Sequence, residues 1–227
     1  MERLVQFLDF FIPRFCLSCR VKLHSKEIYL CSECSDKIIR PTENRIAQEF
    51  NKKFEKGKII SGFTSAYLFE KDKPLQHLIH SLKYEENFKI GIYLGKKVAE
   101  LCKESIINWK ADYLLPVPLH HLKKAERGYN QSYFIVKGIS SLLKINLNTG
   151  ILKRKKYTST QTRLTLLERK SNIKDAFTIE KIKPIKDKII ILVDDVITTG
   201  ATITECGEVL LKNGAAKVYA LSVAIAD

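Results

Sequence analysis

The sequence of 227 residues predicts an α/β fold, in which helices cover a mostly parallel sheet behind a small cysteine-rich module. From residue 61 onward, short apolar runs alternate with stretches of helical periodicity, and this β-α-β order favours a parallel sheet. Before that point, four cysteines stand in two C-x-x-C pairs. We therefore expect a cysteine module over 1–45, a polar, lysine-rich linker over 46–60 and an α/β domain over 61–227.

Composition excludes some classes of protein. Hydrophobic residues make up 45% and charged residues 28%, as in ordinary globular proteins. Apolar runs fall short of the roughly 18–20 residues of a membrane helix, and the first residues lack the pattern of a signal peptide. We expect a cytoplasmic protein without a transmembrane segment, and peripheral contact with the inner membrane stays open.

Half of the net charge of +14 lies in one segment, residues 151–174, which holds eight lysines or arginines and one glutamate. Such a segment favours an anionic partner, whether phosphate, pyrophosphate, nucleic acid or an acidic membrane. The alternative is a lysine-rich surface that is simply solvated.

The cysteine pairs predict a metal site. Each C-x-x-C pair can direct two thiolates at one point, and two pairs complete the four-sulfur tetrahedron that structural Zn²⁺ prefers. Disulfide and redox interpretations are weaker, because no secretory signal precedes the pairs and redox motifs seldom come in twos. The expected ligands are Cys16, Cys19, Cys31 and Cys34.

The first elements of the α/β domain follow from local patterns. Residues 61–70 carry aromatic and β-favouring side chains and predict a strand. Pro74 suits the first turn of a helix, and helical periodicity continues there and again over 88–107. Residues 111–120, ADYLLPVPLH, predict a strand that two prolines stop. The periodic apolar residues of the first helix are Leu75, Leu78, Ile79 and Leu82.

The remaining elements complete the alternation. We expect a loop over 121–132, then a helix that carries Phe134, then a basic strand-like piece. Residues 187–195, DKIIILVDD, read as a buried strand, and the helix after it is expected to begin near Thr202, where Thr202 and Glu205 fit a capping box. Gly214 suits the end of that helix, and residues 217–226 predict the last strand.

Two kinds of polar group follow residues 189–193, the apolar run of the strand 187–195. In an open α/β sheet, ligands bind beyond the carboxyl ends of the strands, where Asp194 and Asp195 would emerge. The turn at 198–202 offers backbone N–H groups at a helix start, which attract phosphate, and Gly200 permits close approach. Carboxylates suit a vicinal diol, with Mg²⁺ nearby. Ribose 5-phosphate satisfies both.

The run ILVDDVITTGAT resembles the motif with which type I phosphoribosyltransferases bind 5-phosphoribosyl-1-diphosphate (PRPP). This resemblance implies their Rossmann-like fold. It implies that Asp194 and Asp195 hold the ribose hydroxyls. A phosphatase-like or receiver-like aspartate site would leave the threonine-glycine turn unexplained. The residues implied to cradle the 5-phosphate are Thr198, Thr199, Gly200, Ala201 and Thr202.

A second string, ERGY, looks like the pyrophosphate loop of adenine-type phosphoribosyltransferases. It maps onto Arg127, Gly128 and Tyr129, with backbone amides facing the diphosphate and Arg127 supplying charge. Together with the acid pair, Arg127 is thereby implied in catalysis. Standing alone, the string would be read as a basic turn before a helix.

The order of motifs resembles that of the ComF/ComFC proteins over nearly the whole chain. The cysteine module, LKY (82–84), PVPLH, RGYNQS, the segment 160–177 and the acid-pair motif all occur in that order. The resemblance implies a link to DNA uptake in competent bacteria. The basic residues that would close over pyrophosphate or meet DNA are Lys153, Arg154, Lys155, Lys156 and Arg163.

Three functions follow from the resemblance. An enzyme would displace pyrophosphate from Mg²⁺-PRPP in favour of an acceptor that the sequence does not identify. A non-catalytic accessory protein would bind single-stranded DNA and the competence DNA-uptake machinery through its basic segment. A regulator would bind PRPP without turnover. The sequence leaves the choice, and the oligomeric state, open.

Overall fold

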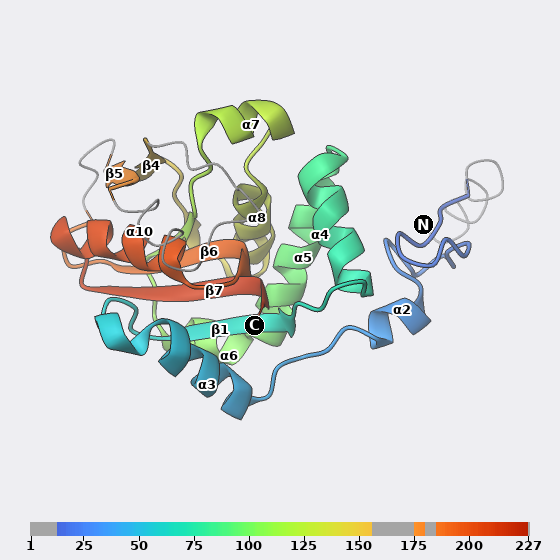
Figure 1. Ribbon diagram of the computed structural model, residues 1–227, viewed down its shortest axis with the longest axis horizontal. Coiled ribbons are helices and arrows are strands. Elements are labelled where there is room, and N and C mark those ends of the chain that lie inside the picture. The colour runs from blue at the N-terminus through green and yellow to red at the C-terminus, as the bar shows by residue number, and fades with distance from the viewer. Residues whose placement is uncertain (1–12, 156–174, 180–184, 227) are drawn as a thin grey trace.

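The structure is a computed structural model that describes residues 13–155, 175–179 and 185–226 (Figure 1). Most of the basic segment lies outside these residues, including Lys156 and Arg163. Within the described part, none of the helices is long and apolar enough to span a membrane.

The centre of the fold is a five-stranded parallel sheet in the order β1-β7-β6-β2-β3. A separate antiparallel pair joins β4 to β5. This arrangement confirms the predicted α/β class. The strands are β1 (Phe63–Leu68), β2 (Tyr113–Pro116), β3 (Asn146–Leu147), β4 (Leu152–Arg154), β5 (Phe177–Ile179), β6 (Ile189–Ile197) and β7 (Lys217–Ile225).

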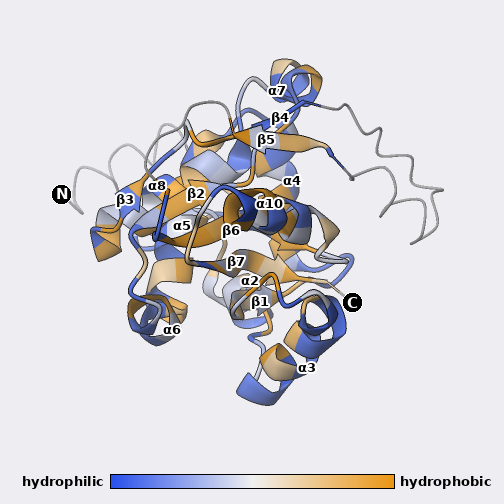
Figure 2. Ribbon diagram, turned by 90° about the vertical axis from the view of Figure 1, so that its left-hand side faces the viewer, coloured by the Kyte–Doolittle hydropathy of each residue, from blue (hydrophilic) through white to orange (hydrophobic). Residues whose placement is uncertain are grey.

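Helices bury both faces of this sheet, which explains the continuous apolar run of β6. Ile191 and Val193 belong to the core shared with α4, α5 and α8, whereas Ile190 and Leu192 belong to the core shared with α10. The central strands accordingly carry the hydrophobic colour in Figure 2. The helices are α4 (Pro74–Tyr84), α5 (Phe88–Leu101), α6 (Lys103–Asn108), α8 (Gln131–Leu143) and α10 (Ala201–Lys212).

Helices α5 and α8 approach closely because glycines line their contact. A Cβ atom on Gly95 would strike the backbone oxygen of Ile135, and one on Gly138 would strike that of Ile92. The single helix expected over 88–107 is divided at Cys102 into α5 and α6. Helix α4 begins at Pro74 as predicted.

Two expected loops are helical. Residues 121–132 contain α7 (His121–Arg127), which buries none of its residues and therefore lacks the apolar stripe that would reveal a helix. The expected linker contains α3 (Glu43–Lys53) and a short 3₁₀ turn, η1 (Glu55–Gly57). The buried carboxylate of Glu49 on α3 forms ion pairs with Arg45 and Lys53, at N···O distances of 3.0 and 2.9 Å. Because a charged residue is buried there, the hydropathy pattern does not indicate a helix.

The predicted capping box of the last helix is wrong. Helix α10 begins at Ala201, with Gly200 as its N-cap at φ 75°. The Oε1 atom of Glu205 accepts a hydrogen bond from the backbone N–H of Asp175 at 2.7 Å, so this carboxylate ties the helix to the start of the β5 region instead. The helix ends as expected, with Gly214 at φ 94°.

The cysteine module packs against the α/β domain. It includes a short helix, α2 (Ser32–Asp36), and lies beside α4 and α5 in Figure 1. Tyr29 meets Tyr93 of α5 edge to face, with 5.2 Å between ring centroids. Leu23 and Leu30 join the same core as α4 and α5.

Candidate functional site

The acid pair lies where β6 loses one of its neighbours. Strand β2 stops at Pro116, which pairs with Val193, and the last link is the hydrogen bond from the N–H of Val117 to the oxygen of Val193 at 2.9 Å. Beyond that point β6 remains paired only with β7. Asp194 and Asp195 therefore stand within the strand, beside the gap left by β2, and not after the strand end as we expected.

Both carboxylates are held by specific partners. The Ser132 hydroxyl at the start of α8 donates to Oδ1 of Asp194 at 3.0 Å, and the N–H of Asp195 donates to the same oxygen at 2.9 Å. The Lys83 ammonium at the end of α4 lies 2.8 Å from Oδ2 of Asp195. The N–H of Val196 donates to the other oxygen at 2.6 Å. The pair is thus oriented from three different elements.

The surroundings of Asp194 favour its protonated form. Burial and the adjacent Asp195 charge raise the pKa of Asp194 to about 7, against the opposing effects of Lys83 and Ser132. Burial lowers the pKa of Lys83, but the charges of Asp195 and Asp194 outweigh it, and the pKa is raised overall. Near neutral pH the pair therefore binds a proton readily while Lys83 stays charged.

The threonine-glycine turn forms a small hollow beside the pair. The hollow has a volume of about 40 Å³ and is lined by Asp194, Val196, Ile197 and residues 198–203. Gly200 is required here, because a Cβ atom would lie 2.7 Å from a ring carbon of Phe54 and the φ is 75°. The first N–H groups of α10, which have no partner within a helix, follow directly. Backbone N–H groups at a helix start are donors suited to an anion.

The predicted pyrophosphate loop follows α7 at the end of β2. Arg127 is the last residue of α7, and its guanidinium carbon lies 5.3 Å from the ring centroid of Tyr84. Gly128 has φ 75° and open space where a Cβ would be. The Tyr129 hydroxyl donates to the oxygen of Leu82 at 2.6 Å. The loop is therefore fixed by the last turn of α4, and the Tyr129 hydroxyl has a structural partner.

Positive side chains from three elements gather near the acid pair. Burial lowers the pKa of Lys123 on α7, and the charges of Arg127, Arg154 and Lys83 lower it further. Burial lowers the pKa of Arg154 on β4, against the opposing effect of the charge of Asp194. An anion that binds among these cations relieves the repulsion between them. The four cations are Lys83, Lys123, Arg127 and Arg154.

Sequence reasoning missed three residues of this site. Lys83, Lys123 and Ser132 had no assigned role, although LKY and RGYNQS were among the strings that carried the family resemblance. Each of the three lies within a few residues of a helix end, and Lys83 and Ser132 contact the acid pair directly.

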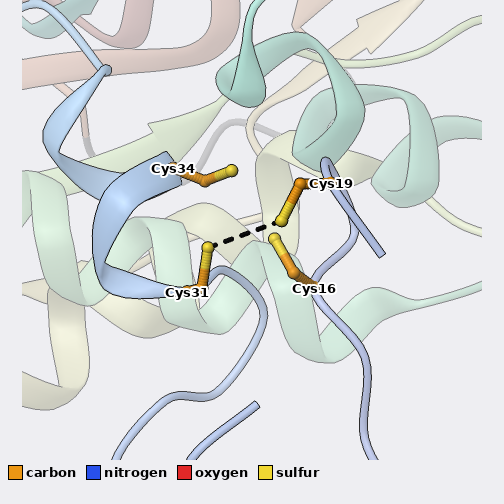
Figure 3. A group of neighbouring side chains, drawn as sticks. All are labelled: Cys16, Cys19, Cys31 and Cys34. Carbon is orange, nitrogen blue, oxygen red and sulfur yellow. Dashed lines mark hydrogen bonds between the residues drawn. The ribbon is translucent and has the colours of Figure 1, made fainter. Parts of the chain in front are cut away.

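The four predicted zinc ligands come together (Figure 3). Their sulfurs all lie within 4.8 Å of one another, and those of Cys19 and Cys31 are 3.6 Å apart. Tetrahedral Zn²⁺ with bonds of about 2.3 Å places its sulfurs about 3.8 Å apart, so the donor set fits the ion. Burial raises the pKa of Cys16, but backbone hydrogen bonds from Cys19, Cys31 and Ser18 outweigh it and lower the pKa to about 6.

The raised pKa of Asp194 makes stability depend on pH. Between the ordinary carboxyl pKa of about 4 and 7, the folded protein binds a proton that the unfolded chain releases. The free energy of unfolding of the ligand-free protein should therefore fall as pH rises through this window, and Asp194→Asn should flatten the fall. Urea unfolding at a series of pH values measures it, with exposed Asp187→Asn as control. Equal slopes in wild type and Asp194→Asn would contradict the assignment.

The cysteine cluster predicts a metal content. Protein purified without chelator should contain about one Zn²⁺ per chain by mass spectrometry of the metal. Cys34→Ser should lower that content and the melting temperature, whereas Cys102→Ala, which removes a buried thiol outside the cluster, should leave the content unchanged. A folded, zinc-free protein with four titratable thiols would refute the four-sulfur site.

Comparisons with known proteins extend over almost the whole chain. A model of the phosphoribosyl transferase domain matches residues 130–226. Competence protein F of Haemophilus influenzae is 31% identical over 241 residues, which cover 96% of this chain and 99% of that protein. DNA utilization protein YhgH of Escherichia coli is 34% identical over 149 residues, or 64% of each chain.

Among solved structures, a purine phosphoribosyltransferase from Pyrococcus horikoshii matches with a TM-score of 0.40 and 21% identity, over 59% of this chain and 74% of that chain. The relationship itself rests on the sequence comparisons. With its cysteine cluster, its parallel sheet and its phosphoribosyl transferase domain, the chain belongs to the family of Competence protein F.

Proposed function

We propose that this protein binds Mg²⁺-PRPP at the acid pair and transfers the phosphoribosyl group to an acceptor, with release of pyrophosphate, in a process linked to DNA uptake. One observation supports this above the others. The acid pair, the threonine-glycine turn and the loop at Arg127 lie at one edge of the sheet, at the ends of the neighbouring strands β6 and β2. Sugar, 5-phosphate and diphosphate of one ligand can reach them together.

Each part of the ligand has a chemically suited partner. Ribose hydroxyls donate hydrogen bonds, and the carboxylates of Asp194 and Asp195 accept them. The 5-phosphate would occupy the hollow at residues 198–202, where backbone N–H groups and threonine hydroxyls donate. The diphosphate would lie toward Arg127 and Lys123, whose charges it neutralises.

Mg²⁺ enters with the substrate and neutralises part of the diphosphate charge. The contribution of the chain is positioning and charge stabilisation. The acid pair fixes the sugar, the turn fixes the phosphate, and the cations stabilise the departing pyrophosphate. The acceptor is the part of the reaction for which the described residues supply no partner.

A second candidate is a non-catalytic protein that binds single-stranded DNA. The names Competence protein F and DNA utilization protein favour it, as does the basic segment that begins with residues 153–155 beside the site. A PRPP-sensing regulator is the third candidate. Pyrophosphate release across candidate acceptors separates an enzyme from a sensor, and a steep salt dependence of DNA affinity is required by the DNA-binding function.

The proposal predicts the effect of removing one carboxylate. Wild-type protein should bind PRPP in Mg²⁺ buffer, and Asp195→Asn should weaken binding about tenfold or more, because charge-assisted hydrogen bonds to the ribose are lost. Isothermal titration measures both affinities, with Asp187→Asn as control. Absence of PRPP binding by the wild type, or equal affinity in Asp195→Asn, would contradict the proposed site.

A further inference from the structure

The last turn of α4 contacts the site through three consecutive residues. The oxygen of Leu82 accepts from the Tyr129 hydroxyl at 2.6 Å. The Lys83 ammonium pairs with Asp195 at 2.8 Å, and the Tyr84 ring lies under the Arg127 guanidinium at 5.3 Å. This turn therefore joins the acid pair on β6 to the loop that follows α7, and Lys83 lies between the two.

In the ligand-free protein, Lys83 contacts the carboxylate that the proposed function assigns to a ribose hydroxyl. Oδ1 of Asp195 already accepts from the N–H of Val196 at 2.6 Å, and Oδ2 contacts Lys83 at 2.8 Å. Oδ1 of Asp194 accepts twice, from Ser132 and from the N–H of Asp195. A vicinal diol that binds both carboxylates therefore meets the Lys83 ammonium at Oδ2 of Asp195, which it either shares with Lys83 or takes over.

The ion pair of Lys83 and Asp195 is partly open to solvent. Its side chain is 21% exposed and that of Asp195 is 12% exposed, so a ligand can reach both. An ammonium that loses a carboxylate needs another anion nearby. The charges of Arg127 and Lys83 repel each other, as do those of Lys123 and Lys83, and the proposed function assigns the diphosphate to these cations. The charged or titratable groups that face the acid pair and Lys83 are Lys123, Arg127, Arg154 and Cys206.

We propose that Lys83 is a ligand-binding residue that exchanges partners: it pairs with Asp195 in the empty site and contacts the diphosphate once ribose hydroxyls occupy Asp195. The inference rests on the proposed function and names a residue for one part of the ligand. It makes Lys83 selective for diphosphate-bearing ligands, since ribose 5-phosphate would displace it without offering it a new anion.

The test compares PRPP with ribose 5-phosphate, which lacks the diphosphate. Affinities are measured by isothermal titration for wild type, Lys83→Met, Lys83→Arg and Lys89→Met, an exposed lysine of α5 that serves as control. Lys83→Met should weaken PRPP binding about tenfold or more, through the loss of one charge-assisted contact. It should leave ribose 5-phosphate binding unchanged or strengthen it, because the ammonium that this ligand has to displace is gone. Lys83→Arg should retain most of the affinity for PRPP, and Lys89→Met should match wild type.

If the ion pair of Lys83 and Asp195 only stabilises the fold, the two ligands should respond alike to Lys83→Met. Equal losses of both ligands in Lys83→Met, or unchanged PRPP affinity, would overturn the exchange while leaving the proposed function intact. Failure of the wild type to bind either ligand would instead overturn the proposed function and the exchange with it.

A second measurement needs only the wild-type chain, in case Lys83→Met does not fold. Acetylation of Lys83 by acetic anhydride is followed by mass spectrometry of its peptide. PRPP should slow the modification, because the ammonium is held by the diphosphate, whereas ribose 5-phosphate should accelerate it, because the ammonium is released from Asp195. The same change with both ligands would overturn the exchange.

Discussion

The site depends on keeping two adjacent carboxylates partly buried on β6. Two like charges this close would repel each other and would be costly to remove from water. Lys83 compensates the charge of Asp195, Ser132 orients Asp194, and Asp194 binds a proton near neutral pH. These partners come from α4 and α8, so the position of both helices is part of the chemistry of the site.

Close packing of the helices holds these partners in place. Glycines let α5 and α8 lie in direct backbone contact, which fixes the start of α8 and with it Ser132. Helix α3 lies behind the turn at 198–202, where Phe54 fills the space that a side chain at Gly200 would need. The ring of Tyr84 and the hydroxyl of Tyr129 join α4 to the loop after α7. Helices α3, α4 and α8 therefore set the spacing between the subsites.

The sequence predicts those features that depend on residues close together in the chain. The parallel sheet, the helix start at Pro74 and the helix end at Gly214 follow from periodicity and backbone preference, and the cysteine spacing led to four sulfurs at one point. Helix α7 was missed because no apolar face marks it. Lys83 was missed because its partner Asp195 is distant in the sequence, and only the packing of α4 against the end of β6 brings them together.

In the proposed complex, one ligand links the acid pair to the threonine-glycine turn. A crystal structure with ribose 5-phosphate bound would show whether it does. We expect the phosphate in the hollow at residues 198–202, ribose hydroxyls on Asp194 and Asp195, and the Lys83 ammonium moved away from its position 2.8 Å from Asp195. A phosphate bound elsewhere, with the pairing of Lys83 and Asp195 unchanged, would contradict it.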